Sequence, residues 1–380
     1  MKPLKLFKLI INLIFNDILM NSIIDNNNIQ KINLLVFEFF SGIGGMHESL
    51  IHLEKIKIDK IFPFDINQNA NSTYFENFKI KPFSISIESF SLNDYENLIK
   101  NNLKDNNIKI LWTMSPPCQP FTRQGNMEGL NDNRSSAFIH LMNNIFLKTK
   151  NEFLPDFFIL ENVKNFEISE ANKMLCDILN NKKYYFLQFL FSPNDFGVPN
   201  SRLRFYLIAS KIKKFEIQEE YLNNIDKIIK DKNIILNNLN FEKKNIRNFL
   251  NIDKEKDKLI NSSYYLTKEV LNKKSCLSMD IALLQNYSTN CFTKGYTKLF
   301  KGTGSILLLE EKLYKENLNP LDLFGYIRYF TPKEILKFLC FNENFVFPKN
   351  LTEKAKYKLL GNSINVKVVN ILMNYLFNYY

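Results

Sequence analysis

The chain is poor in the residues from which disulfide frameworks, zinc sites and histidine-based catalytic triads are built. Its 380 residues include five cysteines and three histidines. Because the cysteines are odd in number and form no Cys-x-x-Cys pair, the sequence fits neither a disulfide scaffold nor a zinc site. We therefore expect a reducing compartment, no metal site, and a cysteine nucleophile that is activated without histidine. Cys176, Cys276 and Cys340 stand in apolar surroundings and are expected to be packing residues.

The sequence also lacks a segment that is suited to cross a membrane or to direct secretion. Residues 4–20 are mostly apolar, but Lys5, Lys8, Asn12 and Asn16 interrupt them at helical spacing. This pattern predicts an amphipathic helix rather than a membrane span, and no small-residue cleavage site follows it. We expect residues 1–32 to form an N-terminal extension of unknown role, and the protein to lie in the cytoplasm, the nucleus or both.

The composition is that of a globular enzyme-sized chain. Hydrophobic residues make up 45% of it, and 35 residues are phenylalanine. The formal net charge of +11 is compatible with a polyanionic partner such as nucleic acid. Lysine, asparagine and isoleucine are frequent along the whole chain, however, so a general compositional bias explains the charge equally well.

Segments typical of strands and helices alternate from residue 33 onward. The expected strands are 34–39, 60–64, 109–114 and 157–161, and the expected helices are 45–54, 67–77, 134–148 and 169–180. Two further apolar segments, 184–191 and 203–210, predict a closing antiparallel pair. The alternation predicts an α/β fold with a doubly wound, mostly parallel sheet that is covered by helices on both faces.

The character of the chain changes after this alternation ends. We interpret residues 33–210 as one domain and residues 211–324, which begin with a lysine- and asparagine-rich stretch, as a smaller domain or insertion. Residues 325–380 return to helical patterns at 331–340 and 364–379, and these helices are expected to pack back on the first sheet.

A glycine-rich turn follows the first expected strand. It contains Phe40, Ile43, Gly44 and Gly45, and it opens the first helix, where doubly wound folds hold a nucleotide. Asp65 ends the second strand and is suited to accept hydrogen bonds from ribose hydroxyls. Together these residues favour a nucleoside-bearing cofactor, although Asp65 could instead cap the next helix.

A cysteine stands in a proline-rich turn directly after the third strand. The run from Ser115 through two prolines to Cys118, followed by Gln119 and Pro120, presents a thiol on a stiffened loop. We interpret Cys118 as a presented nucleophile, with a core thiol beside a turn as the alternative.

Three polar residues later in the chain are candidates to act with this thiol. Glu161 ends a strand, and a carboxyl group in an apolar cleft could hold a proton and donate it to a ring nitrogen of a substrate. Arg202 and Arg204 stand at alternate positions of a strand start and therefore share one face, from which they could stabilise a thiolate or bind phosphate. A capping glutamate and surface arginines are the alternatives.

The order of these blocks resembles the motif set of the cytosine-C5 methyltransferases. The resemblance covers nearly the whole chain after residue 33 and is carried by residues 40–45, 115–119, 161–163, 202–204 and 361–363. Two further blocks, 120–123 and 291–296, look like the tRNA-type branch, the DNA methyltransferase 2 family. Residues 124–134 are spaced more like a DNA-type enzyme, and residues 211–274 match no pattern of the family.

The resemblance implies a function, a cofactor and a set of site residues. It implies a Rossmann-like class I methyltransferase fold with a target-recognition domain in residues 211–324. It also implies transfer of a methyl group from S-adenosylmethionine to C5 of cytosine 38 in the anticodon loop of tRNA, chiefly tRNA-Asp, by a monomer with weak or no action on DNA. The residues implied for catalysis are Cys118, Glu161, Arg202 and Arg204, and those implied around the cofactor are Phe40, Ile43, Gly44, Gly45, Asp65, Ile87, Glu88, Ser115, Asn362 and Ser363.

Three alternatives to this interpretation differ in what they require. A DNA cytosine-C5 methyltransferase is favoured by residues 128–134 and opposed by residues 120–122. A silent nucleic-acid-binding protein would be expected to lack one of the four catalytic residues. A nicotinamide dehydrogenase would need a Gly-x-Gly-x-x-Gly turn, which the sequence does not contain. Lysines and aromatic residues in and around 294–301, including Phe292, are candidate RNA contacts or, equally, ordinary surface lysines with inward-packed rings.

Overall fold

The computed structural model describes residues 31–103, 107–117, 135–236, 241–250, 262–315 and 318–378. The helix predicted within residues 4–20 lies outside these ranges. The strands are β1 (Ile32–Phe39), β2 (Ile56–Phe64), β3 (Lys109–Met114), β4 (Phe157–Val163), β5 (Tyr185–Phe191), β6 (Arg204–Ser210), β7 (Asp280–Leu283), β8 (Ser305–Leu308) and β9 (Ile327–Arg328). The helices are α2 (Gly45–Ile51), α3 (Gln68–Phe78), α4 (Leu92–Asn102), α5 (Ser136–His140), α6 (Glu170–Asn181), α7 (Asn233–Leu236), α8 (Ile246–Leu250), α10 (Lys268–Leu271), α11 (Pro332–Phe338), α12 (Glu353–Asn362) and α13 (Val366–Asn378).

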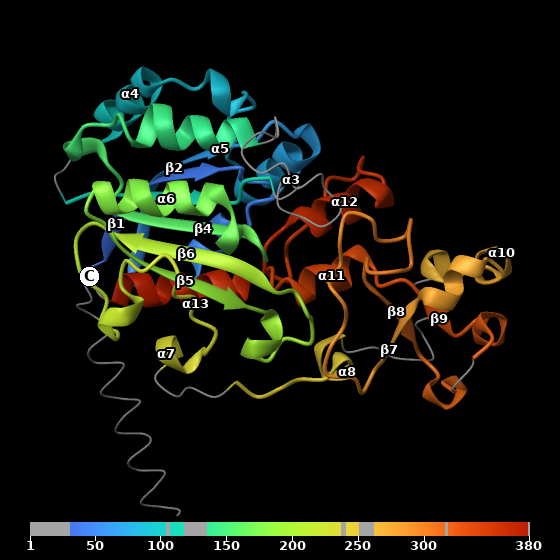
Figure 1. Ribbon diagram of the computed structural model, residues 1–380. Coiled ribbons are helices and arrows are strands. Elements are labelled where there is room, and N and C mark those ends of the chain that lie inside the picture. Colours follow the sequence, from blue (N-terminus) through green and yellow to red (C-terminus); the bar gives the residue numbers. More distant parts are fainter. Residues whose placement is uncertain are drawn as a thin grey trace, which may run out of the picture.

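A mostly parallel sheet organises the larger part of the chain (Figure 1). Its strand order is β2-β1-β3-β4-β6-β5. Strands β1 to β4 run parallel, whereas β6 is antiparallel to both β4 and β5. The predicted doubly wound α/β fold and the predicted antiparallel pair are therefore confirmed.

Helices cover both faces of this sheet. One face carries α4, α5 and α6, and the other carries α7 and α13, as Figure 1 shows, together with α2. Because both faces are covered, β1 is apolar on each side: Leu35 and Phe37 enter one core, and Leu34 and Val36 enter the other. Complete burial of one such side chain contributes about 1.5–3 kcal/mol.

Local sequence signals explain where several helices begin. Ser91 and Asp94 form a reciprocal capping box at the start of α4, and Thr331 and Glu334 form another at the start of α11. In α11 the residue after Thr331 is Pro332, which fits the first helical position.

The largest differences from the predicted element boundaries concern one helix and one strand. The helix predicted over 134–148 is an α-helix only from Ser136 to His140 and continues as a π-helical segment, Leu141–Phe146. The second strand begins at Ile56 instead of residue 60, because polar residues can occupy an edge strand whose outer side faces solvent.

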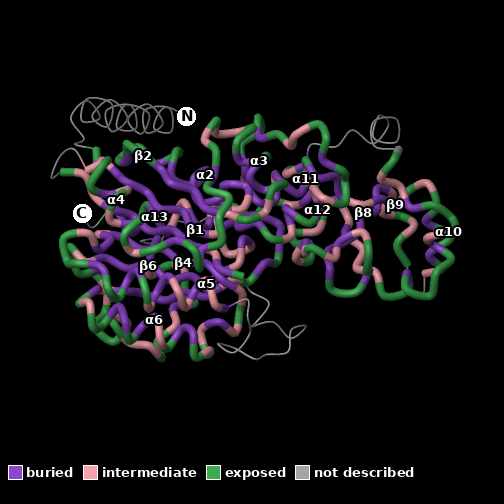
Figure 2. Tube along the Cα trace, turned by 90° about the horizontal axis from the view of Figure 1, so that it is seen from above, coloured by how far each residue is buried: buried purple, intermediate pink, exposed green. Residues whose placement is uncertain are grey.

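A second hydrophobic cluster lies beside the main sheet. The short strands β7, β8 and β9 form its sheet, and residues of α8, α10, α11 and α12 pack against them. Figure 2 shows this smaller lobe extending from the end of the molecule where α3, α11 and α12 lie. Of the C-terminal helices, α13 packs on the main sheet as expected, whereas α11 and α12 belong to the second cluster.

Candidate active site

The carboxyl ends of three neighbouring strands bring the predicted motifs together. Phe39 at the end of β1 pairs with Met114 at the end of β3, and Met114 pairs with Leu160 near the end of β4. Since β6 runs the other way, its first residue, Arg204, pairs with Val163 at the same edge. The sheet therefore collects the segments that follow β1, β3 and β4 and the segment that precedes β6.

Asp65 organises the glycine-rich turn. Its Oδ2 accepts a hydrogen bond of 2.9 Å from the backbone N–H of Gly42, and its Oδ1 accepts one of 2.8 Å from Asn67. Burial raises the pKa of the Asp65 carboxyl, while these two bonds act in the opposite direction. The N-cap of α3 is Asn67 and not Asp65, so the capping alternative for Asp65 is wrong.

Two glycines of the turn, Gly44 and Gly45, leave no room for side chains. A Cβ atom on Gly44, whose φ is +90°, would lie 2.3 Å from Cε2 of Phe78. On Gly45 it would lie 2.5 Å from Cγ1 of Ile364, so the turn packs directly on the C-terminal segment. Ile43 is buried between the two lobes.

Phe40 and Ser115 link the turn to the end of β3. The Ser115 hydroxyl donates to the carbonyl oxygen of Phe40 over 3.1 Å. Phe40 itself has a φ of +56°, which is rare for a bulky residue and turns the chain sharply after β1.

Ile87 and Glu88 lie in a single 3-10 turn with different exposure. Ile87 is buried, whereas Glu88 is exposed. The hydroxyls of Ser136 and Ser86 donate to the Glu88 carboxylate, and the first of these bonds contributes most to lowering its pKa. Glu88 is therefore an ionised hydrogen-bond acceptor at the exposed border of the candidate site.

Asn362 and Ser363 end α12 and complete the arrangement. Ser363 is buried, and its carbonyl oxygen accepts a hydrogen bond from Arg202. Near the glycine-rich turn, the hydroxyls of Ser41 and Thr113 are buried and have no hydrogen-bond partner among the described residues. Unpaired buried hydroxyls beside the Asp65 carboxylate and a glycine turn fit a polar nucleoside cofactor such as S-adenosylmethionine.

Glu161 and Arg204 form an ion pair at the centre of the edge. Glu161 is 7% exposed, and its Oε1 lies 3.4 Å from Nε of Arg204. Burial raises the pKa of the Glu161 carboxyl, and the positive charges of Arg204 and Arg202 offset only part of this effect. A carboxyl with a raised pKa holds a proton more readily, which is what a proton donor requires.

Arg202 joins the two lobes. Its Nη1 donates to the carbonyl oxygen of Phe292 over 3.2 Å, and its Nη2 donates to the carbonyl oxygens of Gly361 and Ser363. The predicted common face of the two arginines is confirmed, because both contact Cys291: Nη1 of Arg202 lies 3.3 Å from its Sγ and Nη2 of Arg204 lies 3.6 Å from it.

Cys291 is a member of this cluster that the residue-level reasoning missed. Burial by itself would raise the pKa of its thiol, but the charges of Arg202 and Arg204 bring it below its ordinary value. In the sequence, Cys291 begins the block 291–296. That block indicated the branch of the family but gave no sign that the cysteine itself takes part in the site.

Cys118 lies outside the described residues, as do Gln119, residues 120–123 and residues 124–134. The chain up to Pro117 is described, and it reaches the same edge. Nδ2 of Asn162 donates to the carbonyl oxygen of Pro116 over 3.4 Å, which ties the proline turn to the residue next to Glu161. Asn162, like Cys291, was not a predicted site residue.

The remaining cysteines behave as expected for packing residues. Cys176 and Cys276 are buried, and Cys340 is partly buried. Burial raises the pKa of the Cys176 thiol to about 12 and that of Cys340 to about 11. Phe292 and Tyr296 also pack inward, at 3% and 2% exposure, which excludes them as stacking surfaces for RNA.

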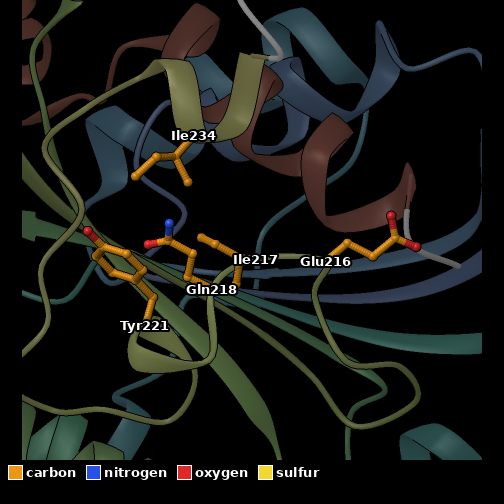
Figure 3. Close-up of a pocket in the computed structure, with 5 residues that line it drawn as sticks. All are labelled: Glu216, Ile217, Gln218, Tyr221 and Ile234. Carbon is orange, nitrogen blue, oxygen red and sulfur yellow. The ribbon is translucent and has the colours of Figure 1, made fainter.

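Other features of the described chain do not add a second site. Within the described ranges, no group of three or more His, Cys, Asp or Glu residues is placed to hold a metal ion, and no helix is long and apolar enough to span a membrane. A shallow hollow lined by Glu216, Ile217, Gln218, Tyr221 and Ile234 is shown in Figure 3. The backbone N–H of Asn223 bonds to Phe186, so the hollow lies near the end of β5 remote from Phe191 and the candidate site.

Comparison with known proteins gives a consistent result. The family described as C-5 cytosine-specific DNA methylase matches residues 34–378. The chain is 37% identical over 349 residues to a tRNA (cytosine(38)-C(5))-methyltransferase of Schizosaccharomyces pombe, with 90% of this chain and 96% of the relative covered. It is 35% identical over 378 residues to a DNA (cytosine-5)-methyltransferase of Dictyostelium discoideum, covering 90% and 94%. The solved structure of the Entamoeba histolytica methyltransferase EhMeth superimposes with a TM-score of 0.75 at 33% identity, covering 92% of this chain and 98% of that one.

Proposed function

Because this chain belongs to the C-5 cytosine-specific DNA methylase family, we propose that it methylates C5 of cytosine in tRNA, at position 38 of the anticodon loop. The observation that carries the proposal is the pairing of Glu161 with Arg204 at the strand edge that Pro116 and Pro117 also reach. The methyl group comes from S-adenosylmethionine, whose sulfonium makes that methyl electrophilic.

Cytosine C5 needs activation before it can accept a methyl group. We assign this activation to Cys118, whose thiolate adds to C6 of the ring. Glu161 holds a proton because its carboxyl is buried, and it donates this proton to N3 as the thiolate adds. The resulting enamine carries electron density to C5. After methylation, the C5 proton passes to water and N3 returns its proton to Glu161, which restores the C5–C6 double bond and releases the Cys118 thiolate.

The two arginines have different tasks in this proposal. Arg204 contacts Glu161 and Cys291 directly, so it supplies positive charge beside the reacting groups. Arg202 donates hydrogen bonds to three backbone carbonyl oxygens and therefore fixes the positions of residues 292 and 361–363. We assign Asp65, Ser115 and the turn from Phe40 to Gly45 to the cofactor, together with Ile87, Glu88, Asn362 and Ser363.

The target base must leave its stack to reach the thiol. Unstacking costs less in a single-stranded loop than in a duplex, which favours an anticodon loop as substrate. The name of the Schizosaccharomyces pombe relative supports tRNA, whereas the Dictyostelium discoideum relative is named for DNA. DNA cytosine-C5 methylation is therefore the second candidate. We expect a monomer in the cytoplasm or nucleus, with residues 211–324 contributing target recognition.

The test is transfer of labelled methyl from S-adenosylmethionine to aspartate tRNA transcripts, with duplex DNA measured alongside. A matched transcript carries uridine in place of cytosine 38. We expect label on the first transcript only. Label on DNA alone would establish the second candidate, and label on both transcripts would contradict position 38. Other tRNA transcripts with a cytosine at position 38 serve to determine how far the preference for aspartate tRNA extends.

A further inference from the structure

Glu38 is a buried acid within a strand that is otherwise apolar. It lies one residue before the end of β1, is 0% exposed, and points to the face covered by α2. The proposed chemistry uses Glu161 as its acid and gives no task to Glu38. An acid with no exposed surface is costly unless it is neutral or hydrogen-bonded, so its surroundings indicate what it does.

Glu38, Tyr74 and His47 form a linear hydrogen-bonded chain beneath the glycine-rich turn. Oη of Tyr74 lies 2.8 Å from Oε2 of Glu38 and 2.8 Å from Nδ1 of His47. The backbone N–H of His47 donates to Oε1 of Glu38 over 3.3 Å, which attaches the first turn of α2 to the same carboxyl. Tyr74 is 0% and His47 6% exposed, so the chain leads from a closed interior toward the surface.

This chain of three groups has two fully bonded arrangements. In the first, a protonated Glu38 donates to Tyr74, and Tyr74 donates to a His47 ring that carries its proton on Nε2. In the second, an ionised Glu38 accepts from Tyr74, and His47 carries its proton on Nδ1 and donates to Tyr74. Passage from the first to the second moves one proton along each bond and releases one from Nε2 of His47, so atoms and charge balance.

The electrostatic surroundings act on Glu38 in opposing directions. Burial raises the pKa of Glu38 to about 8, the hydrogen bonds from Tyr74 and His47 lower it, and the nearby Asp65 raises it. Burial lowers the pKa of His47 to about 4, so its ring is neutral in both arrangements. The acid of α2, Glu48, instead contacts Nε2 of His52 and accepts a hydrogen bond from the backbone N–H of Asn342. Asp65, His47 and Tyr74 are thus the titratable groups that act on Glu38.

The hydrogen-bonded groups Glu38, Tyr74 and His47 lie next to residues that we assign to the cofactor site. Asp65, which acts on Glu38 electrostatically, also holds the turn through Gly42. The unpaired hydroxyl of Thr113 stands directly opposite Glu38 on β3. A positive charge placed above this turn would stabilise the ionised form of Glu38, since opposite charges interact strongly in a weakly polar interior.

We propose that Glu38, Tyr74 and His47 form a proton relay under the cofactor turn, through which Glu38 loses its proton when the sulfonium cation S-adenosylmethionine binds. The product, S-adenosylhomocysteine, lacks the sulfonium charge and leaves Glu38 protonated. The relay thereby favours the methyl donor over the product, and the more so as the pH rises. This inference rests on the proposed use of S-adenosylmethionine.

Titration calorimetry in two buffers of different ionisation enthalpy tests the relay, because it counts the protons released on binding. In the unmodified protein at neutral pH, we expect S-adenosylmethionine to release more protons than S-adenosylhomocysteine. The ratio of the two affinities should rise about tenfold for each unit by which the ligand lowers the pKa of Glu38. In Glu38→Gln, the difference in proton release and the pH dependence of the ratio should both vanish.

Matched variants show whether the loss of proton release is specific to the relay residues or follows from any mutation of a buried group. Glu48→Gln alters another buried glutamate, on α2, and should keep the difference. Tyr74→Phe removes the hydroxyl that stabilises the ionised carboxyl and should reduce the difference. Tyr95→Phe, at an equally buried tyrosine that bonds Phe153 instead, should not.

Two outcomes of the calorimetry would overturn the proposal. Equal proton release by the two ligands in the unmodified protein would do so, as would an undiminished difference in Glu38→Gln. If that variant does not fold, infrared difference spectra of the unmodified protein remain decisive, because the band of a protonated carboxyl should disappear with S-adenosylmethionine and stay with S-adenosylhomocysteine. Absence of binding by either ligand would refute the cofactor assignment itself and is distinguishable from failure of the relay.

Discussion

The guanidinium of Arg204 lies between an acid and a thiol: its Nε is 3.4 Å from Oε1 of Glu161, and its Nη2 is 3.6 Å from Sγ of Cys291. The same positive charge therefore acts on two ionisable groups whose pKa values are shifted in opposite directions. Its effect on Glu161 is outweighed by burial, so the acid retains a raised pKa, whereas for Cys291 the arginines outweigh burial. This asymmetry separates a proton donor from an easily ionised thiol within one small cluster.

Arg204→Lys should slow methyl transfer by roughly 10²-fold, the effect typical of losing one preorganised donor. Lysine keeps the charge but has no planar group that reaches both Glu161 and Cys291. The melting temperature should change little, since among the described residues Arg204 bonds only one backbone carbonyl, that of its neighbour Leu203. Single-turnover rates with saturating cofactor measure the effect, and an unchanged rate would exclude a role for Arg204 in the chemical step.

Arg202→Lys should instead lower stability, by roughly 1–3 kcal/mol, because buried carbonyl oxygens lose their donors. The carbonyls concerned are those of Phe292, Gly361 and Ser363. Chemical denaturation measures the change, with Arg247→Lys as control, since Arg247 forms a long, half-exposed ion pair with Glu311. Equal stability of the two variants would show that Arg202 does not hold the lobes together.

Glu161→Gln should reduce the rate of methyl transfer by about 10²–10⁴-fold, the usual contribution of a positioned proton donor. S-adenosylmethionine affinity should be retained. In the unmodified enzyme the rate should fall as the pH rises through the raised pKa of Glu161, because the protonated form is then lost. The variant should lack this decline, whereas Glu170→Gln, at an exposed position in α6, should preserve it. A decline that persists in Glu161→Gln would assign it to another group.

Cys118→Ala should abolish methyl transfer and leave binding of S-adenosylmethionine intact. The reason is that no other group in the proposed reaction adds to C6 of the base. A covalent complex with RNA that carries 5-fluorocytosine at the target position should form with the unmodified enzyme and be absent from this variant. Cys340→Ala, at a packing cysteine, is the control and should still form the complex. Full activity of Cys118→Ala would refute the mechanism.

Gly361→Ala should destabilise the protein strongly, because the new Cβ would lie 2.2 Å from the backbone N of Lys294 and 2.3 Å from the carbonyl carbon of Thr293. Overpacking against side chains typically costs about 1–3 kcal/mol, and backbone yields less readily, so we expect the upper part of this range. Gly302→Ala has open space around its Cβ and carries only the strain of a φ of +71°, roughly 1 kcal/mol. Denaturation midpoints compare the two, and a smaller loss for Gly361→Ala would contradict the close packing.

The sequence was most informative where a residue type at a given position is compatible with few structural roles. The alternating apolar segments predicted the parallel sheet, since strands covered on both faces must be apolar throughout. Glu161, Arg202 and Arg204 were identifiable as candidate site residues because each is polar near a strand end. Asn162 and Cys291 were not, since their importance depends on contacts with Pro116 and with the two arginines that only the folded chain creates.

Other parts depended on tertiary packing that periodicity does not encode. Phe292 and Tyr296 alternate with lysines in the sequence, and only the second hydrophobic cluster shows that their rings face inward. The change from α-helix to π-helix after His140 leaves no signal in residue type. Glu38 is similar, because a single acid in an apolar strand indicates an exception without naming its partners Tyr74 and His47.

The attachment of Arg202 to both lobes has a mechanical consequence. If the lobes moved apart, the buried Arg202 guanidinium would lose its hydrogen bonds to three carbonyl oxygens at once. These bonds therefore restrict the movement of one lobe relative to the other. Movement of one lobe against the other therefore carries a free-energy cost, because those buried groups would lose their hydrogen bonds. A target base in a loop, which leaves its stack more easily than one in a duplex, suits such a framework.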